Sequence, residues 1–201
     1  EQSYGINSDI NYHAVLAEDL TIQLNEALYY THIDNPIMLT NDQWGHYYIT
    51  NGKYFVSSLG TDTYIRLNYK STELYVGYNH TEALLQTDSS YSNMPFNPKD
   101  KFSATIAYAI EGKWKMGLEA AYAANQYITY NQPVHNFWFF AAMIQRQFKH
   151  ITFTMNCENL GDTRQSQFET MVEGTRKNPV FKPIWGPTEG RVINLSLKIN
   201  I

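Results

Sequence analysis

The sequence predicts an all-β fold, an antiparallel transmembrane β-barrel, and three observations carry this prediction. Apolar and polar residues alternate with a period of two along most of the chain, and no helical period competes with it. The connections between the alternating segments are short and long in turn. Aromatic residues reach 15% of the 201 residues while charged residues are only 17%, and the mean hydropathy is -0.43. Strands with one apolar and one polar face have this profile.

About nine segments alternate as strands do. They span residues 4–12, 20–34, 47–70, 74–79, 102–110, 114–122, 136–148, 151–157 and 190–201. The third is longer than the roughly 9–11 residues with which a strand crosses a bilayer. We interpret it as one strand that projects beyond the membrane, and a hairpin around Asn51-Gly52 is the alternative.

The connections indicate how the strands cross the membrane. Those at residues 17–19, 71–72, 111–113 and 149–150 are minimal turns, whereas those near 35–46, 86–100 and 127–135, and the one before the last strand, are long. Outer-membrane barrels have tight periplasmic turns and large extracellular loops. If the last strand descends to the periplasm, every short turn is periplasmic and every long loop is extracellular.

Composition argues against several other classes of protein. The net charge of -4 gives no basic footprint for nucleic acid, and the single Cys157 excludes an internal disulfide framework. No segment approaches the roughly 18 consecutive apolar residues of a membrane-spanning helix. The chain opens at Glu1 with neither an initiator Met nor a signal peptide, so we expect a processed start or a piece of a longer protein.

Two further classes of protein fit alternating strands. A soluble β-sandwich binding module would bury the apolar face as a core. A small complete outer-membrane β-barrel with a structural, adhesion or enzymatic role would need closure and an even number of strands. Aromatic residues repeatedly mark strand ends, as Tyr4, Tyr12, Trp114 and Tyr122 do, and this favours the interfacial girdles of a membrane barrel.

Several short motifs recur in order along the chain. Asn159-Leu160-Gly161-Asp162 closes one strand segment, Gly190-Arg191 opens the last, and Ile201 ends it. They resemble the end of TonB-dependent outer-membrane receptors, where an aromatic residue usually stands in place of Gly161 and Phe in place of Ile201. Further stretches are similar to marks of the same family: Leu28-Tyr29-Tyr30-Thr31-His32-Ile33, Asn51 with Gly60-Thr61-Asp62, Gly77-Tyr78, and Pro95-Phe96-Asn97-Pro98-Lys99-Asp100-Lys101-Phe102.

The resemblance implies a 22-stranded barrel with a plugged lumen in the outer membrane of a Gram-negative bacterium. Residues 1–201 would be the C-terminal portion of that barrel domain, about its last nine strands. We expect the plug, the TonB box and the early strands in another chain or in further sequence. The implied function is TonB-dependent uptake of a scarce nutrient such as siderophore-iron, haem or cobalamin. The implied partners are membrane lipid, the TonB complex acting through the plug, and the small-molecule ligand.

The last strand fits this resemblance because its apolar residues alternate strictly with polar ones. We predict that the apolar residues meet lipid and act as the barrel-insertion strand, since an apolar last residue resembles the insertion signal of outer-membrane barrels. These residues are Leu195, Leu197, Ile199 and Ile201.

Aromatic residues in the outer segments are candidates for ligand capture, because their rings stack on a siderophore, corrinoid or porphyrin. The alternative is that they pack the loops together or contact lipid headgroups. The candidates are Trp44, His46, Tyr91, Tyr127, Tyr130, Phe181 and Trp185.

We predict no catalytic, cofactor or structural metal site, and therefore no enzyme. The histidines are dispersed without paired ligand spacing, although capture of haem or a metal chelate by the outer ones stays open; these are His32, His46, His80 and His135. No activated-nucleophile motif or phosphate-binding glycine loop is present, and Cys157 falls on an apolar strand face.

Overall fold

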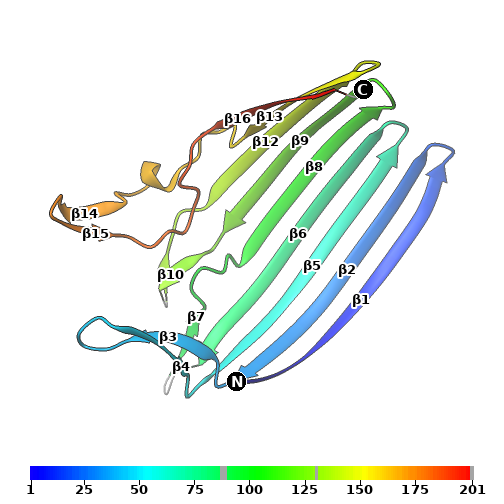
Figure 1. The fold of residues 1–201 in the computed structure, drawn as a ribbon. Coiled ribbons are helices and arrows are strands. Elements are labelled where there is room, and N and C mark those ends of the chain that lie inside the picture. The colour runs from blue at the N-terminus through cyan, green and yellow to red at the C-terminus, as the bar shows by residue number, and fades with distance from the viewer. Residues whose placement is uncertain (87–89, 130, 200–201) are drawn as a thin grey trace.

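The computed structural model describes residues 1–86, 90–129 and 131–199, and its main feature is one antiparallel sheet of long strands (Figure 1). Nine strands follow one another in this sheet, each paired with its neighbours along the path. They are β1 (Gln2–Ala17), β2 (Leu20–Asp34), β5 (Phe55–Tyr69), β6 (Thr72–Gln86), β8 (Asp100–Ile110), β9 (Trp114–Ala124), β12 (Phe137–Gln147), β13 (Ile151–Glu158) and β16 (Val192–Ile199). The prediction of an all-β fold with about nine antiparallel strands is confirmed.

The connections alternate as predicted. The four short turns lie along one end of the sheet, at the upper right of Figure 1, and the long connections lie at the other end. Structure in these connections, which we call the loop end, comprises β3 (Ile37–Asn41), β4 (Tyr47–Asn51), β7 (Tyr91–Asn93), β10 (Tyr127–Thr129), β11 (Gln132–Pro133), a 3-10 turn η1 (Gln165–Gln167), β14 (Val172–Thr175) and β15 (Asn178–Phe181). Within the described residues, no helix is long and apolar enough to cross a membrane.

The prediction of one long strand over residues 47–70 is wrong. Tyr47–Asn51 forms β4 and pairs with β3 in a separate hairpin, and β5 begins only at Phe55. The backbone N–H of Gly52 bonds to Pro36 O at 2.8 Å, and that of Asn35 to Tyr54 O at 3.1 Å, so the base of the hairpin is pinned where it leaves the sheet. The predicted alternative, a hairpin turning at Asn51-Gly52, is also not found, because the chain turns at residues 42–46.

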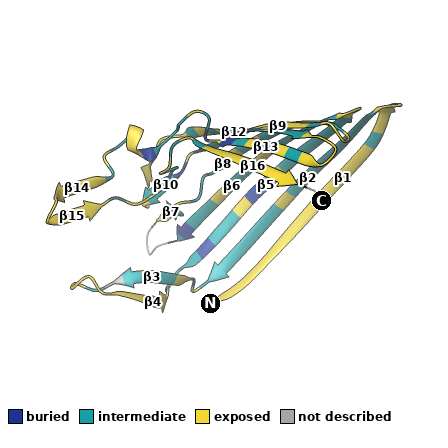
Figure 2. Cartoon of the chain, turned by 45° about the horizontal axis from the view of Figure 1, so that its top comes forward, coloured by how far each residue is buried: buried dark blue, intermediate teal, exposed yellow. Residues whose placement is uncertain are grey.

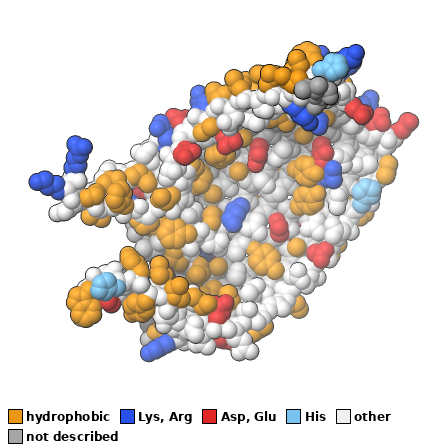
Figure 3. All heavy atoms as spheres, in the orientation of Figure 1, with side chains coloured by type: hydrophobic (Ala, Val, Ile, Leu, Met, Phe, Trp, Pro, Cys, Tyr) orange, Lys and Arg blue, Asp and Glu red, His pale blue; other side chains and the backbone are white. Residues whose placement is uncertain are grey.

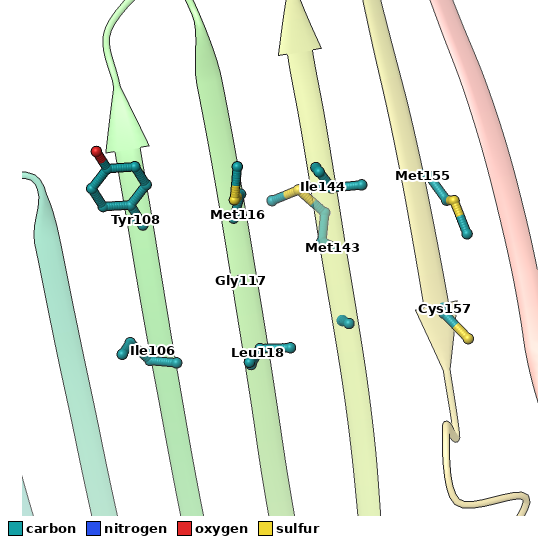
Figure 4. A pocket seen from close by; sticks show the side chains of 10 residues that line it. Ile106, Tyr108, Met116, Gly117, Leu118, Met143, Ile144, Met155 and Cys157 are labelled. Atoms are coloured by element: carbon teal, nitrogen blue, oxygen red, sulfur yellow. The ribbon is translucent and has the colours of Figure 1, made fainter.

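Strand register gives the sheet two chemically different faces. Residues directly opposite one another across the nine strands form an unbroken apolar row: Ala14, Ile22, Leu67, Leu74, Ile106, Leu118, Ala142, Cys157 and Ile193. Figure 4 shows part of this row, with a parallel row of Tyr108, Met116, Ile144 and Met155 beside it. We call the side that bears these rows the apolar face.

The last strand carries its apolar residues on the same face. Leu195 pairs with Met155 and Leu197 with Phe153, and Leu195, Leu197 and Ile199 are 60–66% exposed. The predicted insertion residue Ile201 lies outside the described residues. On this surface, large apolar side chains cover no protein core, so the apolar face requires an apolar medium or partner.

The opposite side, the polar face, carries charged and hydroxylated residues. Arg66 and Glu73 on β5 and β6 form an ion pair at 2.6 Å, and the Arg66 guanidinium also lies 5.1 Å from the centroid of the Tyr75 ring. Asn68 donates a hydrogen bond to Thr21 Oγ1 at 3.1 Å. Figure 3 shows a hollowed face of the molecule over which acidic and basic side chains are scattered.

Buried residues gather at the loop end instead of forming a central core (Figure 2). Val56 and Leu85 face one another in register, and Trp185 and Gln126 are buried where the last long connection folds back onto the strands. Strand β1 is exposed along nearly its whole length, and no pairing joins β1 to β16 in the part of the chain that the structure describes. The sheet is therefore an open, curved layer.

A cluster of polar residues, the strand clamp, ties the end of β13 to the start of β16. Asn159, only 2% exposed, donates from Nδ2 to Thr163 O at 2.8 Å and to Glu189 O at 3.0 Å, and its Oδ1 accepts from Thr163 N. Arg191 donates from Nη2 to Leu160 O at 2.6 Å, while its backbone N–H donates to Asp162 Oδ1.

Backbone geometry accounts for the residue types in the clamp. Asn159 and Asp162 have φ of 49° and 54°, a region that Asn and Asp tolerate better than other residues with a side chain. A Cβ at Gly190 would collide with Asp162 Oδ1. The motifs that open the last strand and close the one before it are thus two halves of one contact.

The clamp predicts a large cost for truncating Asn159. Asn159→Ala leaves two backbone carbonyls and one N–H without their buried partner, so we expect a loss of about 2–3 kcal/mol in unfolding free energy. Urea titration of the full-length protein in detergent measures it. Asn156→Ala, on the polar face of β13, is the matched control and should change stability by less than about 0.5 kcal/mol. Equal losses in both variants would contradict a role for the clamp.

Candidate functional site

The candidate site is the loop end together with the polar face next to it. The predicted capture residues come from four separate connections: Trp44 and His46 from the β3–β4 hairpin, Tyr91 from β7, Tyr127 from β10, and Phe181 and Trp185 from the last connection. No hydrogen bond or ring contact joins one of them to another within the described residues. Tyr130 lies outside the described residues.

The β3–β4 hairpin presents its aromatic tip to solvent. Trp44 is 73% exposed, and the tip is held by Asp42, whose Oδ1 accepts the backbone N–H groups of Trp44 and His46, each at 2.9 Å. These hydrogen bonds, that of His46 foremost, lower the pKa of the Asp42 carboxyl. Because the Asp42 carboxylate accepts two backbone N–H groups of this turn, the Trp44 side chain projects from a hydrogen-bonded turn.

Other candidates range from exposed to buried. Phe181 at the end of β15 is 72% exposed. Tyr91 is 58% exposed, and its ring centroid lies 6.5 Å from that of Phe55 in an edge-on arrangement. Tyr127 is half-buried, and Lys99 Nζ lies 6.0 Å from its ring centroid. Among the Tyr, Phe and Trp candidates, Phe181 and Trp44 therefore have the most open rings.

Trp185 has a different environment, because it anchors the last connection. It is 7% exposed, and its ring packs against Phe137 and Phe168 at centroid distances of 6.2 and 5.9 Å. Its indole Nε1–H donates to Glu169 Oε1, and its backbone N–H donates to Gln165 Oε1 at 2.9 Å. With this burial, Trp185 supports the loop and leaves little ring area for a ligand.

Gln165 is the centre of that anchor and was not singled out from the sequence. It is fully buried, and its Nε2 donates to Glu169 Oε1 and to Pro183 O, both at 2.9 Å. The indole hydrogen bond is the main reason that the pKa of Glu169 is lowered, with Lys182 adding a favourable charge 3.6 Å away. Gln165 and Trp185 meet only in the folded chain, so no short sequence motif predicts this contact.

A hollow of about 420 Å³ lies on the polar face close to the loop end. Gly77 and Ser103 are among the small residues that line it. A larger residue at position 77 would be crowded, because a Cβ at Gly77 would lie 2.9 Å from Ser103 Oγ. Phe137 and Phe139 of β12 form an aromatic wall, and Lys101 stands among the lining residues. In the described part of the chain, Lys101 has no ion-pair partner, so its ammonium is available to an anionic group.

The hollow was not predicted because it depends on register. Asp62, Asn79, Lys101 and Ala123 occupy one row across β5, β6, β8 and β9, although their separations in sequence look unrelated. Alternation placed each residue on the polar face, but it did not show which of them are neighbours.

The outer histidines do not assemble a metal centre. Within the described residues, no group of three or more His, Cys, Asp or Glu side chains is arranged to hold a metal ion. His32, His46 and His80 each contact one carboxylate, at 3.2, 3.0 and 2.6 Å, and His135 stacks on Phe168. These contacts are local, and no two of these histidines share a carboxylate.

Comparison with known proteins finds similarity in structure and none in sequence. No protein-family model matches the chain, and no curated protein matches its sequence. The ferric-catecholate import receptor Fiu from Escherichia coli K12 superposes with a TM-score of 0.61 over 98% of this chain, at 19% identity. The copper transporter OprC gives 0.67 over 99% at 13% identity, and the FrpB iron transporter from Neisseria meningitidis gives 0.61 over 98% at 10% identity.

The chain has the fold of a TonB-dependent receptor barrel. It spans 27–31% of the length of these three proteins, as a portion of such a barrel would. All three are named as receptors or transporters. In barrels of this fold, one face of the sheet meets lipid and the other lines the lumen.

The half-buried Glu169 predicts an acid-sensitive loop. Its pKa is lower in the folded protein than the ordinary 4.5, so its contribution is complete above that value and is lost as the pH falls through the folded pKa. We expect faster hydrogen exchange over residues 165–186 below about pH 4.5. Glu169→Gln should remove this pH dependence. Glu189→Gln, exposed in the same connection, should preserve it, and a dependence that persists in Glu169→Gln would refute the assignment.

Proposed function

We propose that residues 1–201 are the C-terminal portion of the barrel domain of a TonB-dependent transporter in the Gram-negative outer membrane. The transporter takes up a scarce nutrient, such as siderophore-iron, haem or cobalamin. One observation carries this proposal: a nine-strand apolar row stands opposite a polar face, with all long connections at one end. A soluble sandwich would cover the apolar row with a second large sheet. The other sheets among the described residues are three two-stranded hairpins in the long connections.

A small complete barrel is less well supported. Closure would bring β1 beside β16, and no such pairing is present among the described strands. Unpaired strand edges in lipid cost several kcal/mol for each unsatisfied group. The remaining strands and the plug therefore belong to the proposal as partners, in further sequence or in another chain.

The ligand of this transporter would meet aromatic rings at the mouth and a cation in the wall. Trp44 and Phe181 offer exposed rings, and Lys101 beside Phe137 and Phe139 offers charge next to an aromatic wall. Together they favour an anionic ligand with planar groups. The names of the solved structures, which include ferric-catecholate import, point to the same chemistry.

Uptake in whole cells tests this function. Cells that express the full-length protein should take up a radiolabelled ferric catecholate complex, and loss of TonB should abolish that uptake. Lys101→Met removes the charge next to the aromatic wall and should lower uptake at limiting ligand about tenfold. Lys115→Met, on the same face nearer the turns, should leave it unchanged. No gain of uptake for iron complexes, haem, cobalamin or copper would overturn the function.

The membrane position of the sheet has its own test. Leu118 and Glu119 are adjacent in β9 and lie on opposite faces, with Leu118 in the apolar row. Leu118→Lys places a charge in lipid and should cost about 2–4 kcal/mol, seen as loss of the heat-modifiable folded band from outer membranes. Glu119→Lys should assemble normally. Equal tolerance of both changes would argue against the membrane position.

A further inference from the structure

One basic residue breaks the pattern of the apolar face. Arg146 stands opposite Trp114 of β9 and Phe153 of β13, between apolar neighbours on both sides, one residue before β12 ends. Its guanidinium lies 4.6 Å from the Trp114 ring centroid and 5.3 Å from that of Phe148. No carboxylate pairs with Arg146 in the part of the chain that the structure describes. The N–H donors of its guanidinium are therefore available to an anionic group from outside the chain.

The charges around Arg146 are mostly positive. The two turns next to it contribute the cations Lys113 and Lys149 against one carboxylate, Glu111, and all three are exposed. The backbone N–H of Gln147 bonds to Lys113 O at 2.8 Å, so the two turns lie side by side. This end of the apolar face therefore attracts an anion.

An open apolar groove of about 450 Å³ lies nearby on the same face (Figure 4). It is lined by Tyr108, Met116, Ile144 and Met155 in one row and by Ile106, Leu118 and Cys157 in the next. Ala142 stands between Leu118 and Cys157 in register, and its small side chain leaves the depression. Ile144 and Met116 are two residues from Arg146 and Trp114, so the groove is close to the guanidinium.

We propose that this surface binds a glycerophospholipid, with its phosphate on Arg146 and an acyl chain in the groove. A guanidinium hydrogen-bonds phosphate oxygens in pairs, and aromatic rings that flank it are typical of the membrane interface. The groove volume, apolar lining and position next to the cation fit one molecule that has both an anionic and a hydrocarbon part. The inference rests on the proposed membrane position of the apolar face and adds a specific lipid site to it.

The test uses the full-length protein in detergent, titrated with phosphatidylglycerol and observed by native mass spectrometry. Arg146→Gln should lower the fraction of lipid-bound protein at least fivefold, and Arg146→Lys should recover part of it. Ala142→Phe, which fills the groove without touching Arg146, should lower binding to a similar extent. Inorganic phosphate should not displace the lipid, because it lacks the acyl chain.

Lys115→Gln is the matched control, since Lys115 lies opposite Gln145, one position from the Trp114–Arg146 pair, on the polar face. It should bind lipid as the unaltered protein does. Unchanged binding in Arg146→Gln, equal loss in Lys115→Gln, or displacement by inorganic phosphate would each overturn the lipid site. These results are distinguishable from failure of the membrane position itself, in which Leu118→Lys would be tolerated and the protein would remain in solution without detergent.

Discussion

The structure depends on antiparallel pairing that keeps register across nine strands. Because successive side chains in a strand point to opposite faces, a slip of one residue would move every apolar side chain of that strand to the other face. The pairing of Leu67, Leu74 and Ile106 with one another shows the register holding through three strands from different parts of the chain. With the register fixed, the backbone groups are satisfied within the sheet, and one face is free to be apolar.

The register also explains why the functional features lie where they do. The strand ends toward the short turns carry cations and aromatic rings, as Arg146 with Trp114 shows, whereas the strand ends toward the loops carry the hollow with Lys101. The loops need other hydrogen bonds, because their backbone groups lie outside the pairing of the main strands. Gln165 and Asn159 provide it by hydrogen-bonding backbone groups that no strand pairs.

Alternation in the sequence was sufficient to predict about nine strands in the main sheet and the side of each strand that is apolar, because both follow from local spacing. It was not sufficient for residues 47–70, where two strands of different sheets follow one another with compatible alternation. What separates them is the backbone pairing of Gly52 with Pro36, a contact between distant residues. Loop packing was an alternative for Trp185 from the sequence, but its partners Gln165 and Phe137 could not be identified for the same reason, since they lie far away in sequence.

The direction of the strands places a constraint on the proposed barrel. Nine consecutive antiparallel strands leave β1 and β16 running the same way, so direct contact between these two edges would form a parallel pair. Single-chain bacterial barrels have even strand numbers and antiparallel pairs throughout. Closure then requires an odd number of further strands between the two edges.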